Sequence, residues 1–117
     1  MGPLAGIKVV EFEAIGPGPF AGMLLADMGA DVILIDRPVP SGLGLKRERW
    51  NDVMMRGKRS VTLDLKTKDG AAVALELAAR ADALIEGFRP GVMERLGLGP
   101  QAVFARNAKL VYCRMTG

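Results

Sequence analysis

Basic side chains that could bind a phosphate-bearing ligand follow several apolar segments of this sequence. Arg37 comes directly after the apolar run 31–36, Lys66 ends an alternating run, and Arg89 comes soon after the apolar run 83–86. A guanidinium presents paired N–H donors to phosphate oxygens, and an ammonium adds a point charge. If these runs are parallel strands of one sheet, their carboxyl ends meet at one edge. The sequence therefore predicts an anionic, nucleotide-like ligand at that edge.

A second motif suggests a dinucleotide. Gly16, Gly18 and Ala21 have the spacing of a dinucleotide-binding loop, and Asp36 lies at a suitable distance to hold a ribose. Such a loop binds pyrophosphate through backbone N–H groups at a helix N-terminus, and proline has none. Because Pro17 and Pro19 lie within this loop, a stiff turn that begins a helix, with Pro19 at its first position, is favoured over an NAD site.

Composition excludes several classes of site. The chain has 117 residues, a net charge of +3, one cysteine and no histidine. A Ser-His-Asp or Cys-His site cannot be built from this chain alone, and a zinc site is not expected. The single Cys113 cannot form an internal disulfide and predicts a buried strand residue in a reducing, cytoplasmic protein. No apolar run reaches the length of a membrane span, and no signal peptide is expected.

The order of the expected elements predicts an α/β fold with an open, mostly parallel sheet. The expected strands are residues 8–12, 31–36, 60–66, 83–86 and 110–114. The expected helices are residues 20–28, a helix capped by Thr67 or Asp69 and ending near Arg80, residues 92–96, and a helix that begins at Pro100 and ends at Asn107. By the rule for such sheets, the residues of interest are Ile15 to Gly18, Arg37, Lys66 and the turn Gly87, Phe88 and Arg89.

A basic cluster offers an alternative partner, a nucleic acid. The cluster consists of Lys46, Arg47, Arg49, Trp50, Arg56, Lys58 and Arg59, and residues 41–51 are expected to form a surface loop or short helix. Basic residues beside an aromatic ring can bind a phosphate backbone and a stacked base. The charge excess is small and no nucleic-acid motif is present, so a solvated surface is favoured and no nucleic-acid partner is expected.

Several segments together resemble the family III CoA-transferases of the CaiB/BaiF type, and most closely their alpha-methylacyl-CoA racemase branch. They occur in the family's order and cover essentially the whole chain: residues 6–11, 15–20, 25–32, 36–38, 58–66, 88–92, 95–100 and 110–117. The resemblance is to the N-terminal third of these proteins. It implies that residues 1–117 are the N-terminal part of a Rossmann-like CoA-binding domain.

The resemblance assigns roles to residues at the predicted edge. Arg37 matches the arginine that contacts the CoA nucleotide. Leu63, Asp64, Leu65 and Lys66 match the adenosine-binding run, with Lys66 near phosphate and the backbone contacting adenine. Phe88 and Arg89 match a turn along the CoA, and Ile15 is a further binding position. For Asp64 a turn or salt bridge, and for Phe88 simple packing, remain alternatives.

The same resemblance implies an acyl-CoA ligand and no other cofactor. In the family the catalytic histidine and aspartates follow later in the chain, so no catalytic residue is expected among these 117. Family members form interlocked homodimers. The Gly16–Pro19 turn, the short segment from Pro38 to Lys58 and the closing Arg114–Gly117 run favour the racemase branch, while CoA-transferase and free-standing nucleotide-binding module remain alternatives.

Overall fold

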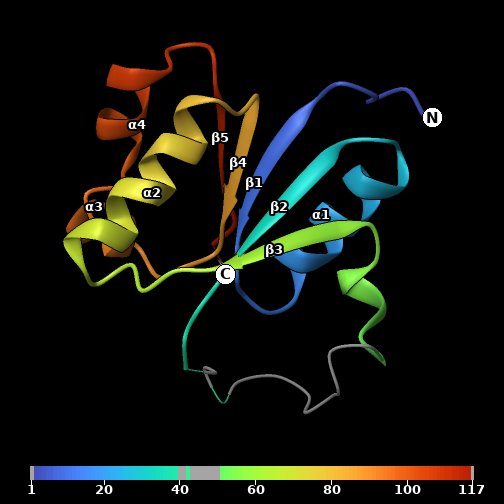
Figure 1. Cartoon of the computed structure of the whole chain (residues 1–117), viewed down its shortest axis with the longest axis horizontal. Helices are drawn as coiled ribbons and strands as arrows, with labels where there is room; N and C mark the ends of the chain where they lie inside the picture. Colours follow the sequence, from blue (N-terminus) through green and yellow to red (C-terminus); the bar gives the residue numbers. More distant parts are fainter. Residues whose placement is uncertain (1, 40–41, 43–50, 117) are drawn as a thin grey trace.

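A computed structural model describes residues 2–39, 42 and 51–116 of the chain (Figure 1). Most of the predicted loop 41–51, with Lys46, Arg47, Arg49 and Trp50, lies outside the described residues. The elements are, in order, β1 (Lys8–Phe12), α1 (Pro17–Asp27), β2 (Asp31–Asp36), the 3₁₀ helix η2 (Val53–Met55), β3 (Lys58–Thr62), α2 (Lys68–Ala79), β4 (Ala83–Glu86), α3 (Val92–Arg95), α4 (Pro100–Arg106) and β5 (Val111–Arg114).

The strands form a sheet with the order β3-β2-β1-β4-β5, and all the described pairings are parallel. This confirms the expected α/β class. Helix α1 packs on one face of the sheet, whereas α2, α3 and α4 pack on the other (Figure 1). The alternation of side chains along β1 shows why both faces need cover: Val10 and Phe12 belong to the core under α2, and Val9 to the core under α1.

Different residues determine where α1 and α2 begin. Helix α2 begins as expected, because the Thr67 hydroxyl accepts the Gly70 N–H at 3.0 Å. Helix α1 begins at Pro17, earlier than the predicted Phe20, so Pro19 is not the first helical residue. Gly16 precedes it with φ 78°, a left-handed conformation that an L side chain rarely adopts.

The predicted strand 60–66 is wrong in its bounds. Strand β3 begins at Lys58 and ends at Thr62. The Asp64 carboxylate accepts the Lys66 N–H at 3.1 Å, and the Thr67 hydroxyl donates to the Asp64 carbonyl at 2.7 Å. These local bonds make residues 64–67 a turn, because aspartate side chains compete with a strand ladder for backbone N–H groups.

Other bounds differ by single residues. Strand β5 begins at Val111 and α3 ends at Arg95, each one residue inside the predicted segment, and Cys113 is partly rather than fully buried. Strands β1, β2 and β4 have the predicted bounds.

A buried ion pair ties β1, β3 and α1 together. The Lys58 ammonium donates to Glu11 Oε2 and to the Pro19 carbonyl, both at 3.0 Å, while Glu11 Oε1 lies 2.8 Å away without hydrogen-bond geometry. The two side chains are 0% and 1% exposed. Burial is the largest influence on Glu11 and raises the pKa of its carboxyl, and Lys58 opposes this shift. Gly22 of α1 leaves the space that the carboxylate fills.

Candidate functional site

The carboxyl ends of the parallel strands converge on one edge of the sheet (Figure 1). Ile15 follows β1, Arg37 follows β2, the 63–66 segment follows β3, and Phe88 and Arg89 follow β4. The structure therefore places every predicted site residue beyond this edge. Ligands of open α/β sheets bind in this position.

Arg37 and Phe88 are in direct contact across the edge. The Arg37 guanidinium lies 5.7 Å from the centroid of the Phe88 ring, although β1 separates their strands. Arg37 Nε also donates to Glu13 Oε2 at 2.5 Å. Its side chain is 40% exposed, and within the described residues its terminal nitrogens make no hydrogen bond. A positioned guanidinium whose terminal N–H groups bind no described residue can bind a phosphate oxygen.

The Phe88 ring is half-buried and also contacts the ring of Phe12. The two rings lie edge to face with centroids 6.2 Å apart and an angle of 65° between their planes. The Phe88 ring therefore packs against the core, which was the alternative to a binding role. It also contacts Arg37 at the edge of the sheet. Arg89 is exposed and makes no ion pair with the described residues.

The segment after β3 is a fixed turn. The Leu63 N–H donates to the Asp36 carbonyl at 3.1 Å, and Leu63 and Leu65 pack partly buried against the main core. The Asp64 carboxylate accepts the Lys66 N–H. It therefore stabilises the turn, which was one of the alternatives to a binding role. Lys66 is exposed, and its ammonium forms no ion pair with a described residue. It makes no hydrogen bond with Arg37 or Phe88.

The loop before α1 does not fit a dinucleotide pyrophosphate. Of its first helical residues, Pro17 and Pro19 lack an N–H, and the Phe20 N–H donates to the Gly16 carbonyl at 3.2 Å. Among residues 17–20 this leaves the Gly18 N–H as a donor, and Gly18 is buried. The geometry thus supports the stiff-turn interpretation.

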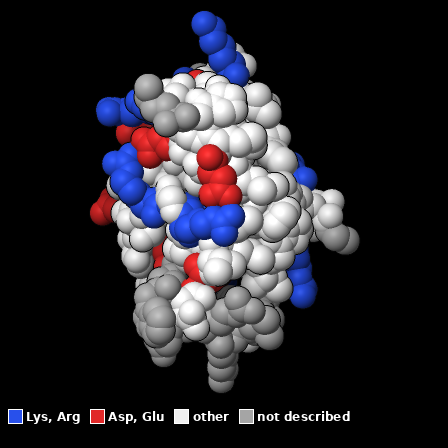
Figure 2. Space-filling model, turned by 90° about the vertical axis from the view of Figure 1, so that its right-hand side faces the viewer, with Lys and Arg blue, Asp and Glu red and all other residues white. Residues whose placement is uncertain are grey.

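The basic residues beside β3 are paired rather than free. Arg56 binds Asp27 and Arg59 binds Asp31, both at 2.6 Å, and Lys58 is buried on Glu11. Figure 2 shows basic side chains next to acidic ones on this side of the molecule, beside a broad uncharged area. Pairing of this kind reduces the positive charge that these three residues could offer to a nucleic-acid backbone.

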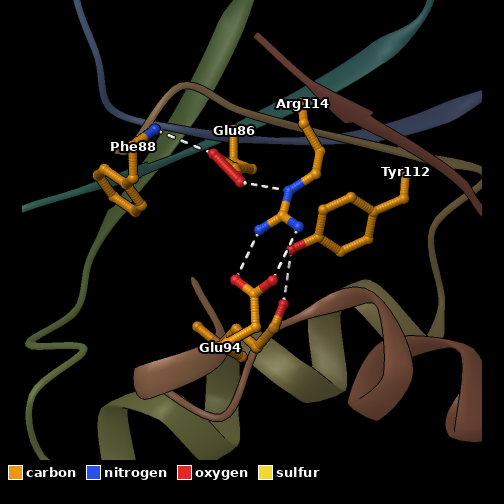
Figure 3. A network of polar contacts seen from close by, with 6 residues as sticks. Glu86, Phe88, Glu94, Tyr112 and Arg114 are labelled. Carbon is orange, nitrogen blue, oxygen red and sulfur yellow. Dashed lines mark hydrogen bonds and ion pairs between the residues drawn. The ribbon is translucent and has the colours of Figure 1, made fainter. Parts of the chain in front are cut away.

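A polar network behind Phe88 was not predicted from the sequence (Figure 3). Glu86, 2% exposed, accepts the Phe88 N–H at 2.9 Å and Arg114 Nε at 3.0 Å. The other nitrogens of Arg114 donate to Glu94 at 2.9 and 2.7 Å. These bonds lower the pKa of Glu94 to about 2 and raise the pKa of Arg114.

The same network includes a tyrosine. The Tyr112 hydroxyl donates to the Leu98 carbonyl at 2.7 Å, and the Arg114 guanidinium lies 5.4 Å from the centroid of its ring. Burial raises the pKa of Tyr112, and the charge of Glu86 adds to the effect. A sequence signal for the network existed, because Glu86 and Arg114 are opposite charges that end two consecutive predicted strands. The structure shows them as direct partners in the sheet register.

The described residues carry neither a metal cluster nor a membrane span. They contain no group of three or more histidine, cysteine, aspartate or glutamate side chains that could hold a metal ion. None of the helices in this part of the chain is long and apolar enough to cross a bilayer.

Comparison with known proteins gives the family. The model of CoA-transferase family III matches residues 4–117. Alpha-methylacyl-CoA racemase of Homo sapiens is 48% identical over 114 residues, which are 97% of this chain and 28% of that protein. The probable fatty acyl-CoA transferase Rv3272 of Mycobacterium tuberculosis is 39% identical over an alignment of 127 positions, which covers 97% of this chain and 31% of that protein.

A solved structure agrees with this assignment. A crystal structure of Rv3272 has a TM-score of 0.86 and 40% identity, covering 97% of this chain and 33% of that chain. The chain thus spans about 28% to 31% of the length of these curated relatives. The match runs through all the elements described above, and the chain belongs to CoA-transferase family III.

Proposed function

We propose that this chain is the CoA-binding part of an acyl-CoA racemase, which epimerises 2-methylacyl-CoA through an enolate. The observation that carries the proposal is the contact of Arg37 with Phe88 at the carboxyl edge of the sheet. It combines a cation that can bind phosphate with an apolar ring, on two loops that meet at this edge. CoA needs both, because it joins a phosphorylated nucleotide to a long, weakly polar pantetheine arm.

Each predicted residue has a role in this proposal. Arg37 and Lys66 bind phosphate oxygens of the CoA nucleotide. The turn at Leu63, Asp64 and Leu65, held by its own hydrogen bonds, presents backbone groups to adenine. In the loop after β4, Phe88 and Arg89 lie along the pantetheine arm. The exposed Ile15, in the loop after β1, covers the arm.

The chemistry assigns a limited part to these residues. Racemisation removes a proton from the carbon beside the thioester and returns it on the opposite face. It therefore requires a base on one side of that carbon and an acid on the other. The chain has no histidine, and we assign none of its residues to proton transfer. Its contribution is binding energy from the CoA portion, which positions the reacting carbon.

A CoA-transferase is the second candidate function. This chain matches a relative named for each reaction. The human racemase is 48% identical, and the probable transferase Rv3272 is 39% identical. We favour the racemase on the higher identity and on the Gly16–Pro19 turn, the short 38–58 segment and the 114–117 run. We further propose an interlocked homodimer and a cytoplasmic location for the whole protein, with no cofactor besides the CoA of the substrate.

Ligand titration tests the proposal. Calorimetry should show tighter binding of CoA than of NAD, and Arg37→Ala and Lys66→Ala should each weaken CoA binding by about tenfold, the ~1.5–3 kcal/mol of a charge-assisted hydrogen bond. Arg106→Ala is the control, because Arg106 binds Glu76 away from this edge. Tight NAD binding that Asp36→Ala abolishes would instead support the dinucleotide interpretation.

A further inference from the structure

Glu86 occupies an unusual position for a charged side chain. It closes β4, is 2% exposed and has a separate partner on each carboxylate oxygen. Burying a carboxylate is costly unless it is paired and hydrogen-bonded. The partners show what is gained: one is the backbone of the Phe88 turn and the other is the guanidinium of Arg114 (Figure 3).

The Phe88 N–H has no partner in the sheet. The ladder between β4 and β5 ends where the Met115 N–H donates to the Glu86 carbonyl at 2.9 Å. Beyond it the chain turns away, and the Glu86 carboxylate takes the Phe88 N–H at 2.9 Å in place of a neighbouring strand. The side chain of the last strand residue therefore fixes the orientation of the residue that contacts Arg37 and Phe12.

Arg114 fixes the carboxylate in turn. Its Nε holds Glu86 and its two terminal nitrogens form a fork on Glu94 of α3. A bidentate guanidinium restricts orientation as well as distance. The Tyr112 hydroxyl on the Leu98 carbonyl ties the turn after α3 to the same strand. The Phe88 turn is thus braced by β5 and α3, on the side away from Arg37.

We propose that Glu86 is a positioning residue for acyl-CoA, with Arg114 and Glu94 as its support, and that it holds the Phe88–Arg89 turn in the conformation that receives the pantetheine arm. This rests on the proposed CoA-binding function. Glu86 acts through the turn and does not touch the ligand. Without it the ring of Phe88 and the backbone of Arg89 sample several orientations, and the arm loses a preformed surface.

Two substitutions separate positioning from general stability. Glu86→Gln keeps the shape but replaces one carboxylate oxygen by an N–H₂ donor, so that either the Phe88 N–H or the Arg114 guanidinium loses its acceptor. Arg114→Lys keeps the charge but cannot form the fork, and it serves alone if Glu86→Gln does not fold. Glu76→Gln is the matched control, because Glu76 also binds two arginines, Arg80 and Arg106, but at an exposed site on α2.

Amide exchange reports on the turn without any ligand. In ¹⁵N-labelled protein we expect the Phe88 amide to exchange at least tenfold faster in Glu86→Gln and Arg114→Lys than in the unsubstituted chain. Amides of β1 and the Glu76→Gln control should not change. An unchanged Phe88 amide in both variants overturns the assignment of Glu86 as the brace of the turn.

Calorimetry with two ligands then reports on positioning. Affinity for CoA should fall about five- to tenfold in both variants, whereas affinity for adenosine 3′,5′-bisphosphate, which lacks the pantetheine arm, should stay within twofold. Equal losses for both ligands, or none for CoA, overturn the inference while leaving the CoA-binding function intact. If the unsubstituted chain binds neither ligand, the proposed function fails, and amide exchange decides whether Glu86 holds the turn.

Discussion

Gly22 of α1 lies directly against the buried pair of Glu11 and Lys58, and Gly22→Ala tests this close approach. A Cβ at this position would lie 1.8 Å from Glu11 Oε1, 2.8 Å from Glu11 Cδ and 3.1 Å from Lys58 Nζ. In an exposed helix the same change would stabilise by about 1 kcal/mol. Here the fully buried pair must separate, which costs about 3–5 kcal/mol. We expect a net loss of roughly 2–4 kcal/mol in the free energy of unfolding.

Urea denaturation followed by far-ultraviolet circular dichroism measures this loss. The control is the same substitution in a chain that carries Glu11→Ala and Lys58→Met, where the methyl group meets no carboxylate. In that background Gly22→Ala should be neutral or stabilise by up to about 1 kcal/mol. An equal loss in both backgrounds, or a loss below about 1 kcal/mol in the natural sequence, would refute the reasoning.

The remaining predictions concern pH, activity and assembly. Since Arg114 lowers the pKa of Glu94 from 4.5 to about 2, the pair stabilises the fold above pH 4.5 and this contribution disappears as pH falls from about 5 to 2. Acid titration of unfolding should show the stability of Glu94→Gln converging with that of the natural sequence over this range. In D₂O the chain should not exchange the α-proton of (R)-2-methylacyl-CoA above buffer, as mass spectrometry would reveal. Light scattering across a dilution series should show self-association through exposed apolar side chains and the edge of β5 that no described strand covers; a monomer at high micromolar concentration would contradict this.

The parts of the fold predicted from sequence are those whose signals are local. Strands β1, β2 and β4 are apolar runs bounded by glycine, proline or a charged residue, and their bounds were predicted correctly. Strand β3 was extended too far because alternation continues through Leu63 and Leu65, and only the Asp64 side chain marks the turn. An aspartate inside an alternating run indicates a turn as readily as a strand, because its side chain can bind the backbone two residues on.

The site shows the same division between local and distant signals. The sequence indicates which residues follow each strand, so Arg37 and Phe88 could be predicted as site residues. Their contact was not readable, because it depends on the order of strands in the sheet. The pairing of Glu11 with Lys58 was hidden for the same reason, since β2 lies between their strands. Glu86 and Arg114, by contrast, are opposite charges at the ends of consecutive strands, which are usually neighbours in a sheet, and they could have been paired.

The central place of β1 in the sheet has a consequence during synthesis. Lys8–Phe12 hydrogen-bonds to β2 on one side and to β4, Ala83–Glu86, on the other. At ribosomal rates, the second partner emerges roughly 4–14 seconds after the first strand. Throughout that interval the innermost strand has an unpaired edge, a substrate for chaperones that bind extended apolar segments. Slow translation before residue 83 would therefore lengthen the exposure of β1, the strand on which the rest of the sheet assembles.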